Sequence, residues 1–109
     1  MSLYGEYIKE REGKQIIEHE DGFATFLIHG DDCYIVDIYV RPAARKSGLA
    51  SKLADEIADR ARALECKFLL GTVNPNTEGA TASLKVLLAY GFQLSGIGND
   101  GLIWFSQKL

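Results

Sequence analysis

An apolar strand, a basic turn and an amphipathic helix follow one another directly between residues 34 and 64. The stretch Tyr34–Val40 is almost entirely β-branched, aromatic or aliphatic, which predicts a strand covered on both faces. Pro42 ends this strand, because proline has no N–H to donate to a sheet ladder. Apolar residues then recur at helical spacing as far as Leu64, with charged residues between them. The pattern predicts a helix that begins close to Gly48 and points its first amides back into the basic turn.

The start of this helix has the properties of a phosphate-binding site. The first four N–H groups of a helix lack intrahelical acceptors, and the helix dipole places about half a positive charge there. Arg45 and Lys46 add full charges, and Gly48 has no Cβ to hold a ligand away from the backbone. Ala50 is the next smallest residue at its position. The hexapeptide from Arg45 to Ala50 therefore has the form Arg-x-x-Gly-x-Ala.

This hexapeptide and its context resemble the GNAT superfamily of acetyl-CoA-dependent N-acetyltransferases. The family's pyrophosphate loop reads Gln/Arg-x-x-Gly-x-Gly/Ala between its fourth strand and the following helix. The preceding Asp-Ile-Tyr-Val-Arg-Pro, which starts at Asp37, is similar to the family's Asp-Leu-x-Val-x-Pro. Gly91-Phe92 is similar to the Gly-Phe that closes its motif B. The resemblance covers the chain from Tyr34 to the C-terminus and leaves the first third unmatched by motif.

The resemblance implies acetyl-CoA as the cofactor and indicates the residues that hold it. The pyrophosphate would bind at Arg45, Lys46, Ser47, Gly48, Leu49 and Ala50. In the family, the strands before and after the helix splay apart, and the pantetheine arm enters the gap like an added strand. The backbone of Ile38, Tyr39 and Val40 would bond to this arm, with the Val40 N–H polarising the thioester carbonyl.

Length and composition predict one domain, residues 1–109. The chain is 47% hydrophobic and 25% charged, which is ordinary globular material with a modest core. Strands are predicted at residues 6–11, 14–19, 23–28, 34–40 and 67–73, helices at 48–64 and 78–90, and a closing hairpin at 92–105 that pairs with the N-terminal meander. The predicted fold is α/β (α+β), a GNAT-like mixed, mostly antiparallel sheet flanked by two main helices.

Local signals add detail to these elements. Asp21-Gly22 predicts a type I′ hairpin turn. Asn76 or Thr77 is predicted to cap the second helix at its start, and Gly91 at its end.

The N-terminal third departs from the resembled family. A GNAT domain usually places two helices there, and these help to form the walls of the acceptor site. Nothing before Tyr34 has convincing helical periodicity, so the chain is predicted to be a short form without them. Two arrangements stay open: an exposed acceptor site, or one that a second subunit completes in a homodimer.

Charge and hydropathy exclude several classes of function. The net charge of −3 argues against a nucleic-acid surface. No apolar run approaches the roughly 20 residues of a membrane helix, and no signal peptide is recognisable. Cys33 and Cys66 form neither a disulfide framework nor a metal motif, so they are predicted to be reduced core residues of a cytoplasmic protein that binds no metal.

Acetyl transfer to an amine requires a proton acceptor for the amine and a proton donor for the leaving thiolate. The family commonly supplies the donor from a tyrosine four residues before its Gly-Phe, a position that Leu87 occupies here. Tyr90 and Ser83, on the same predicted helix, are candidates to replace it. Their structural interpretations are a helix-end aromatic with its hydroxyl in water and an ordinary helix serine.

Asp37 is the candidate that orients or deprotonates the acceptor amine. It is the only charge in the predicted buried strand, where a carboxylate needs a partner. Strand alternation places Asp37 with Tyr39 on one face, and Ile38 with Val40 on the other. Asp37 acts on the amine through water, or else it bonds to a neighbouring backbone or to the N-terminal meander. His29, at the end of the adjacent strand, is a second candidate base, and its structural interpretation as a solvated strand-end residue is favoured. His19 is assigned no role.

The sequence thus predicts an acetyl-CoA-dependent N-acetyltransferase that acts on a primary amine of a small molecule or protein. The alternative is a non-catalytic acyl-CoA-binding or protein-interaction module on the same fold. Leu87 and the missing helices favour this alternative, whereas the intact loop and Asp37 favour the enzyme. A third interpretation, an α/β scaffold without a CoA site, leaves the combination of Arg45, Gly48 and Ala50 at a helix start unexplained.

Overall fold

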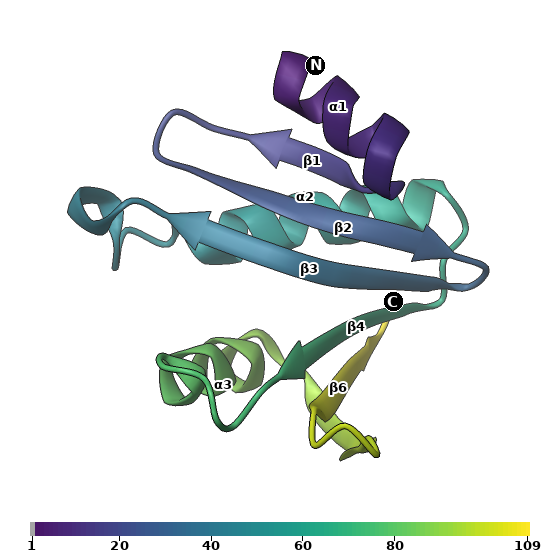
Figure 1. Cartoon of the computed structure of the whole chain (residues 1–109), viewed down its shortest axis with the longest axis vertical. Coiled ribbons are helices and arrows are strands. Elements are labelled where there is room, and N and C mark those ends of the chain that lie inside the picture. Colours follow the sequence, from purple (N-terminus) through teal and green to yellow (C-terminus); the bar gives the residue numbers. More distant parts are fainter. Residues whose placement is uncertain (1) are drawn as a thin grey trace.

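The computed structural model describes residues 2–109, without the side chains of Ala82 and Ser83. Its six strands form one sheet in the order β1-β2-β3-β4-β6-β5 (Figure 1). The elements are α1 (Leu3–Glu12), β1 (Gln15–Glu18), β2 (Gly22–His29), β3 (Asp32–Val40), the 3₁₀ turn η1 (Pro42–Ala44), α2 (Leu49–Ala63), β4 (Phe68–Val73), α3 (Ala80–Tyr90), β5 (Gln93–Ile97) and β6 (Ile103–Lys108). Among the described residues, no helix has the length and apolar character needed to cross a bilayer.

All neighbouring strands are antiparallel except β3 and β4, which α2 connects and which run parallel. The predicted mixed, mostly antiparallel sheet flanked by helices is therefore confirmed. The closing hairpin is also present as β5 and β6. Its predicted pairing with the N-terminal meander is wrong, because β6 pairs with β4 and β5 is the outer strand.

A helix, α1, occupies the N-terminus, so the strand predicted at residues 6–11 is wrong. The prediction that no helix precedes Tyr34 is wrong for the same reason. The Ser2 hydroxyl caps this helix by accepting a hydrogen bond from the Gly5 N–H at 3.0 Å. Gly13 ends it in the left-handed conformation. Ile8, 1% exposed, is the one buried side chain in this helix. With a single anchor, α1 has no apolar stripe whose period reveals a helix in the sequence.

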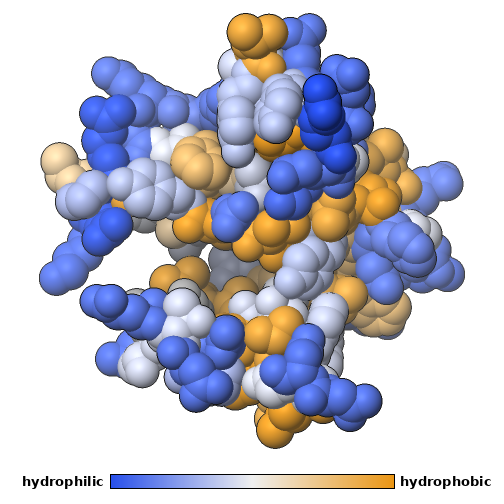
Figure 2. Space-filling view, in the orientation of Figure 1, coloured by the Kyte–Doolittle hydropathy of each residue, from blue (hydrophilic) through white to orange (hydrophobic). Residues whose placement is uncertain are grey.

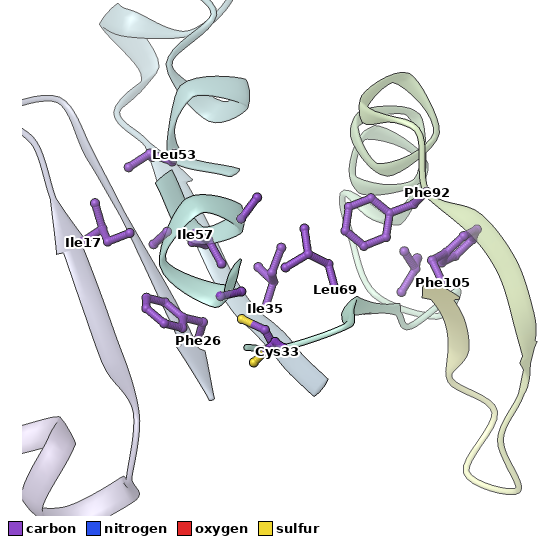
Figure 3. Packing of buried hydrophobic residues seen from close by; sticks show 14 residues of the cluster. Ile17, Phe26, Cys33, Ile35, Leu53, Ile57, Leu69, Phe92 and Phe105 are labelled. Carbon is purple, nitrogen blue, oxygen red and sulfur yellow. The ribbon is translucent and has the colours of Figure 1, made fainter. Parts of the chain in front are cut away.

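One hydrophobic cluster holds α2 and α3 against the sheet. Figure 3 shows it continuing from Phe26 and Ile57 through Leu69 to Phe92 and Phe105. The buried residues of α2 recur at helical spacing, as the sequence predicts: Leu53, Ala54, Ile57, Ala58 and Ala61. Full burial of one leucine or isoleucine side chain contributes about 1.5–3 kcal/mol, so this stripe fixes α2 on the sheet. The two cysteines are buried in the same cluster and unbonded.

A β-bulge in β3 precedes a fork between β3 and β4. Neighbouring residues of β2 lie opposite Ile35 and Asp37, which leaves Val36 as the extra residue. Pairing between β3 and β4 extends only to Tyr34 opposite Leu70. Beyond that point the two strands diverge (Figure 1). The predicted splay of these strands is therefore present.

Gly22 is the first residue of β2, so the predicted type I′ turn at Asp21-Gly22 is wrong. Neither Asp21 nor Gly22 has a positive φ, which a type I′ turn requires. A Cβ on Gly22 would lie 2.4 Å from the carbonyl oxygen of Tyr39. Glycine is needed here because the backbone of β3 approaches closely.

The start of α3 differs from the sequence prediction, whereas its end does not. Gly79 occupies the N-cap in place of Asn76 or Thr77. Gly91 caps the C-terminus as predicted, with φ 108°.

Candidate functional site

The N-terminus of α2 is open to solvent, and no side chain caps it. Gly48 is the N-cap, with φ 86° and no side-chain hydrogen bond to the first turn. A Cβ on Gly48 would have no atom within 4 Å. Ser47, the adjacent hydroxyl, instead donates to the Ala44 carbonyl oxygen at 2.5 Å. The first amides of α2 are therefore available to an external acceptor.

Positive charge surrounds these amides. The Arg45 Nε donates to the Val40 carbonyl oxygen at 3.0 Å, and its guanidinium lies 6.0 Å from the centre of the Tyr39 ring. These contacts hold Arg45 at the end of β3 while the side chain stays exposed. Lys46 is also exposed and adopts φ 65°, which is uncommon for a residue with a Cβ. With the helix dipole, both charges favour a phosphate at Gly48.

The predicted loop residues thus lie together in space. Arg45, Lys46, Ser47 and Gly48 are exposed, whereas Leu49 and Ala50 are half-buried where α2 joins the core.

Hydrogen-bond alternation decides which β3 backbone groups face the fork. The Arg41 N–H donates to the Asp21 carbonyl oxygen, on the β2 side, at 2.8 Å. The backbone N–H and C=O groups of successive strand residues point to opposite sides. Tyr39 lies two residues before Arg41, so its backbone groups also point toward β2. The backbone N–H and C=O groups of Ile38 and Val40 consequently point away from β2 and into the fork. The Val40 carbonyl accepts from Arg45 on that side. The Val40 N–H has no partner in β4, because the pairing of β3 with β4 ends at Tyr34.

The second wall of the fork consists of β4 and α3. A Cβ on Gly71 of β4 would lie 3.3 Å from Leu87 of α3, so this helix packs closely on the strand. Figure 2 shows a hollow between the two halves of the molecule, on the left, where β3 and β4 separate in Figure 1. An extended ligand can therefore enter between the two walls.

Asp37 is exposed, so the prediction of a buried charge is wrong. No element covers β3 on this face beyond the bulge, within the described residues. The Asp37 Oδ2 accepts a hydrogen bond at 2.9 Å from the Thr25 hydroxyl, which belongs to a residue only 2% exposed. The predicted alternation is confirmed: Ile38 and Val40 pack against the core, while Asp37 and Tyr39 face the other way.

The face that carries Asp37 is aromatic and acidic at its outer end. Phe23 of β2 and Tyr39 of β3 have ring centres 5.8 Å apart. A cavity of about 450 Å³ lies beside them, lined by Glu18, His19, Glu20, Asp21, Gly22, Phe23, Tyr39 and Arg41. Arg41 pairs with Asp21 at 3.3 Å and donates to the Glu20 carbonyl oxygen at 2.9 Å. Glu18 accepts from the Ser2 hydroxyl at 2.9 Å, so three carboxylates and one guanidinium line the cavity. This lining favours a cationic group.

The Tyr90 hydroxyl is directed at α2. It donates to Asp55 Oδ1 at 2.5 Å, and the Tyr90 ring lies 6.0 Å from that of Phe92. Partial burial, together with the bond to Asp55, raises the pKa of Tyr90 to about 12. A phenol with this pKa that already donates to a carboxylate is a poor proton donor at neutral pH. The geometry favours a structural link between α3 and α2.

The other sequence candidates have varied positions. Ser83 lies in α3, but its side chain is outside the described part of the structure, so its role stays a prediction. His29 is exposed at the end of β2. The His19 Nε2 lies 2.6 Å from Glu56 Oε2 and so connects the end of β1 to α2, a contact that no sequence signal indicated.

Two hydroxyl groups meet at the base of the fork, where the pairing of β3 with β4 ends, and the sequence did not predict this contact. The Tyr34 phenol oxygen lies 2.8 Å from the Thr72 hydroxyl oxygen. The Tyr34 ring also lies 5.6 Å from that of Trp104. These residues come from β3, β4 and β6, and only the register of the sheet brings them together.

An uncapped helix start beside diverging parallel strands, in a mixed α/β domain, is a geometry suited to a phosphate group on an extended ligand. Residues 6–92 match the model of the acetyltransferase (GNAT) family. The chain therefore belongs to the GNAT acetyltransferase family, as the sequence resemblance indicated.

Solved structures share this fold at low sequence identity. A GNAT family acetyltransferase from Elizabethkingia anophelis, with acetyl-CoA bound, has a TM-score of 0.75 and 16% identity, over 95% of this chain and 82% of that one. The PaiA N-acetyltransferase from Thermoplasma acidophilum, in complex with coenzyme A, has a TM-score of 0.77 and 12% identity, over 98% of this chain and 69% of that one. The anti-CRISPR protein AcrVA5 has a TM-score of 0.68 and 20% identity, over 84% of this chain and 96% of that one. No curated protein matches this chain in sequence.

Proposed function

We propose that this protein binds acetyl-CoA and transfers its acetyl group to a primary amine. The observation that carries the proposal is the start of α2, where Gly48 leaves the first amides uncapped and open in a chain of the GNAT acetyltransferase family. Two proteins of the same fold are known with acetyl-CoA or coenzyme A bound, which supports this choice of cofactor.

The chain's residues fit this cofactor. The amides that follow Gly48 would hold the pyrophosphate together with the side chains of Arg45 and Lys46. Gly48, Arg45 and Lys46 are all exposed. The backbone of Ile38 and Val40 would bond to the pantetheine arm as a strand bonds to its neighbour. Tyr39 would contribute its side chain to the opposite face rather than its backbone to the arm.

Bound acetyl-CoA supplies an activated acetyl group as a thioester. The free N–H of Val40 would donate to the thioester carbonyl oxygen and stabilise the negative charge that develops there. Asp37 would take up the proton of the amine, directly or through water, on the face opposite α2. The fork holds both reactants close, and proximity alone can supply several kcal/mol of barrier reduction.

Titration calorimetry with acetyl-CoA tests the cofactor site. In the variant Gly48→Glu, a carboxylate stands where the pyrophosphate would bind, and we expect affinity to fall about 100-fold or more, each tenfold being 1.4 kcal/mol. Gly79→Glu is the matched control, because Gly79 is also an N-cap, with φ 85° and no atom within 4 Å of its Cβ position. Equal affinity in the wild-type protein and Gly48→Glu would contradict the proposal.

Release of free thiol from acetyl-CoA, with a panel of primary amines, tests the transfer step. Small diamines, amino sugars and lysine-containing peptides sample the acceptors that an acidic, aromatic face favours. We expect release that depends on the amine. Binding of acetyl-CoA without release on any amine would instead support the non-catalytic acyl-CoA-binding module.

A further inference from the structure

The cavity of about 450 Å³ lies at the ends of β1 and β3, next to Val40. Figure 1 shows both strand ends on the same side of the sheet, at the left. The lining includes Tyr39 and Arg41, which are the chain neighbours of Val40, and Gly22, which pairs with Val40. A volume of this size is typical of small-molecule sites. Because Val40 would hold the thioester, an inference about this cavity rests on the proposed function.

Strand register places three side chains of the cavity in one row, on the face of the sheet opposite α2. Glu18 pairs with Phe23, and Phe23 pairs with Tyr39. Paired residues of neighbouring strands share a face. Neighbouring strands lie about 4.8 Å apart, so the row spans about 10 Å across the three strands. It has a carboxylate at its outer end and two aromatic rings, with centres 5.8 Å apart, at its inner end.

Asp37 stands one row further along the same face. The pair of Thr25 with Asp37 lies two residues from the pair of Phe23 with Tyr39 in each strand. Asp37 is therefore about 7 Å from Tyr39 along β3. The surface from Asp37 to Glu18 passes over both aromatic rings. A ligand that crosses these rings can thus have one end beside Asp37 and the other end beside Glu18.

The charges of the lining favour a cation at the outer end of this surface. Three carboxylates and one guanidinium line the cavity, and the guanidinium, Arg41, pairs with Asp21 at 3.3 Å. Glu18 and Glu20 are both exposed, so a charged ligand can reach them. The Ser2 hydroxyl that donates to Glu18 is neutral and leaves the charge of this carboxylate in place.

A second cation, Arg45, lies near the inner end. Its guanidinium is 6.0 Å from the centre of the Tyr39 ring. In the proposed complex with acetyl-CoA, the pyrophosphate would balance this charge. The faces of aromatic rings also attract cations and pack against alkyl chains. The surface therefore suits an alkyl chain that carries an amine at each end.

We propose that this cavity selects aliphatic diamines as acetyl acceptors. Glu18 and Glu20 bind the far ammonium group, while the alkyl chain crosses Phe23 and Tyr39 and the near amine reacts beside Asp37. The near amine, once neutral, forms the C–N bond as the C–S bond breaks with its electron pair on sulfur. Asp37 passes the proton of this amine to solvent, and the departing thiolate takes a proton from solvent. The far ammonium group keeps its protons.

A matched pair of acceptors tests the proposal. In α,ω-diaminooctane the chain is long enough to cross both rings, and in aminooctanol a hydroxyl replaces the far amine. We expect kcat/KM for thiol release from acetyl-CoA to be about tenfold higher with the diamine, a difference of about 1.4 kcal/mol. The difference should be in KM rather than in kcat, because the far amine takes no part in the chemistry.

Paired substitutions test whether the two carboxylates cause this preference. Glu18→Gln combined with Glu20→Gln removes both charges and keeps an oxygen that can accept from the Ser2 hydroxyl. We expect the ratio of kcat/KM, diamine over aminooctanol, to fall to about one. Glu10→Gln combined with Glu78→Gln is the control, because it changes the net charge equally at exposed positions outside the lining and should preserve the ratio.

Calorimetry adds a measurement that requires no transfer. With coenzyme A in place of acetyl-CoA, we expect the Kd of diaminooctane to be about tenfold lower than that of aminooctanol. The Glu18→Gln, Glu20→Gln protein should bind both amines with similar Kd.

The outcomes separate this proposal from the proposed function. A wild-type ratio near one would overturn diamine selection and leave acetyl transfer intact. A ratio that persists without the two carboxylates would overturn it as well, and so would a loss that is equal for both amines, which indicates a merely structural role. A protein that releases no thiol with any amine would overturn the transfer reaction and, with it, the selection of an acceptor.

Discussion

At the scale of single residues, Gly22 and Gly48 are glycines for different physical reasons. Gly48 has a left-handed backbone that leaves the start of α2 open, whereas Gly22 lacks a Cβ because β3 lies against it. The first glycine serves the proposed cofactor site. The second serves the close pairing of β2 with the part of β3 that forms the fork.

The role of Gly22 predicts the effect of Gly22→Ala. The added methyl group would lie 2.4 Å from the Tyr39 carbonyl oxygen, so the strands must move apart. We expect the free energy of unfolding to fall by about 1–3 kcal/mol, as for other overpacked sites. Urea denaturation measures this change. Gly96→Ala is the control, since nothing lies within 4 Å of its Cβ position, and a comparable loss there would contradict this explanation.

At the scale of elements, α2 is held by polar contacts at its outer surface as well as by its apolar stripe. Tyr90 of α3 bonds to Asp55, and His19 at the end of β1 bonds to Glu56. The helix that would carry the cofactor is therefore linked to both halves of the molecule. Its N-terminus, in contrast, has no side-chain partner.

The Tyr90–Asp55 bond predicts a pH dependence of stability. The pKa of Tyr90 is about 12 in the folded protein and that of an unfolded tyrosine is about 10. The unfolded state therefore loses this proton first, and the contribution of the bond is complete below about pH 10 and lost as pH rises through about 12.

Urea denaturation of Tyr90→Phe across this range measures that contribution. We expect the variant to be less stable than wild type at neutral pH by at most about 1 kcal/mol, because the bond is exposed. The difference should vanish near pH 12. Burial, followed by the charge of Cys66, also raises the pKa of Cys33 to about 12, but both proteins share that group. A difference that is constant with pH would contradict the assignment.

At the scale of the whole molecule, the fork divides the sheet into two parts. One contains β1, β2, β3 and α2, and the other contains β4, β5, β6 and α3 (Figure 1). The parts share the core cluster and the short pairing of β3 with β4. A ligand in the fork would contact both parts and would bind only the folded protein.

Acetyl-CoA should therefore raise the melting temperature of the protein. At 100 times its Kd, a ligand specific for the folded state adds about 2.7 kcal/mol. For a domain of this size that corresponds to a rise of about 10 °C or more. Differential scanning fluorimetry measures the shift, and Gly48→Glu should show little of it. An equal shift in both proteins would place the ligand elsewhere.

Local sequence patterns were sufficient to predict several features of the fold and of the candidate site. The apolar stripe of α2, the strand β4 and the cap at Gly91 each depend on side chains within a few positions of one another. The open helix start at Arg45–Ala50 is equally local, because its charge comes from its own dipole and adjacent side chains. These features could be predicted from the sequence together with the class of fold.

The tertiary structure alone decided the rest. Ile8 is the one side chain that anchors α1 in the fold, so residues 3–12 carry no apolar stripe that predicts a helix. Asp37 is exposed because nothing in the described chain covers that face of β3. The bulge at Val36 and the meeting of Tyr34 with Thr72 depend on register between strands. A shift of one residue in a strand turns its side chains to the other face. Register is a property of paired strands, so no single stretch of sequence contains it.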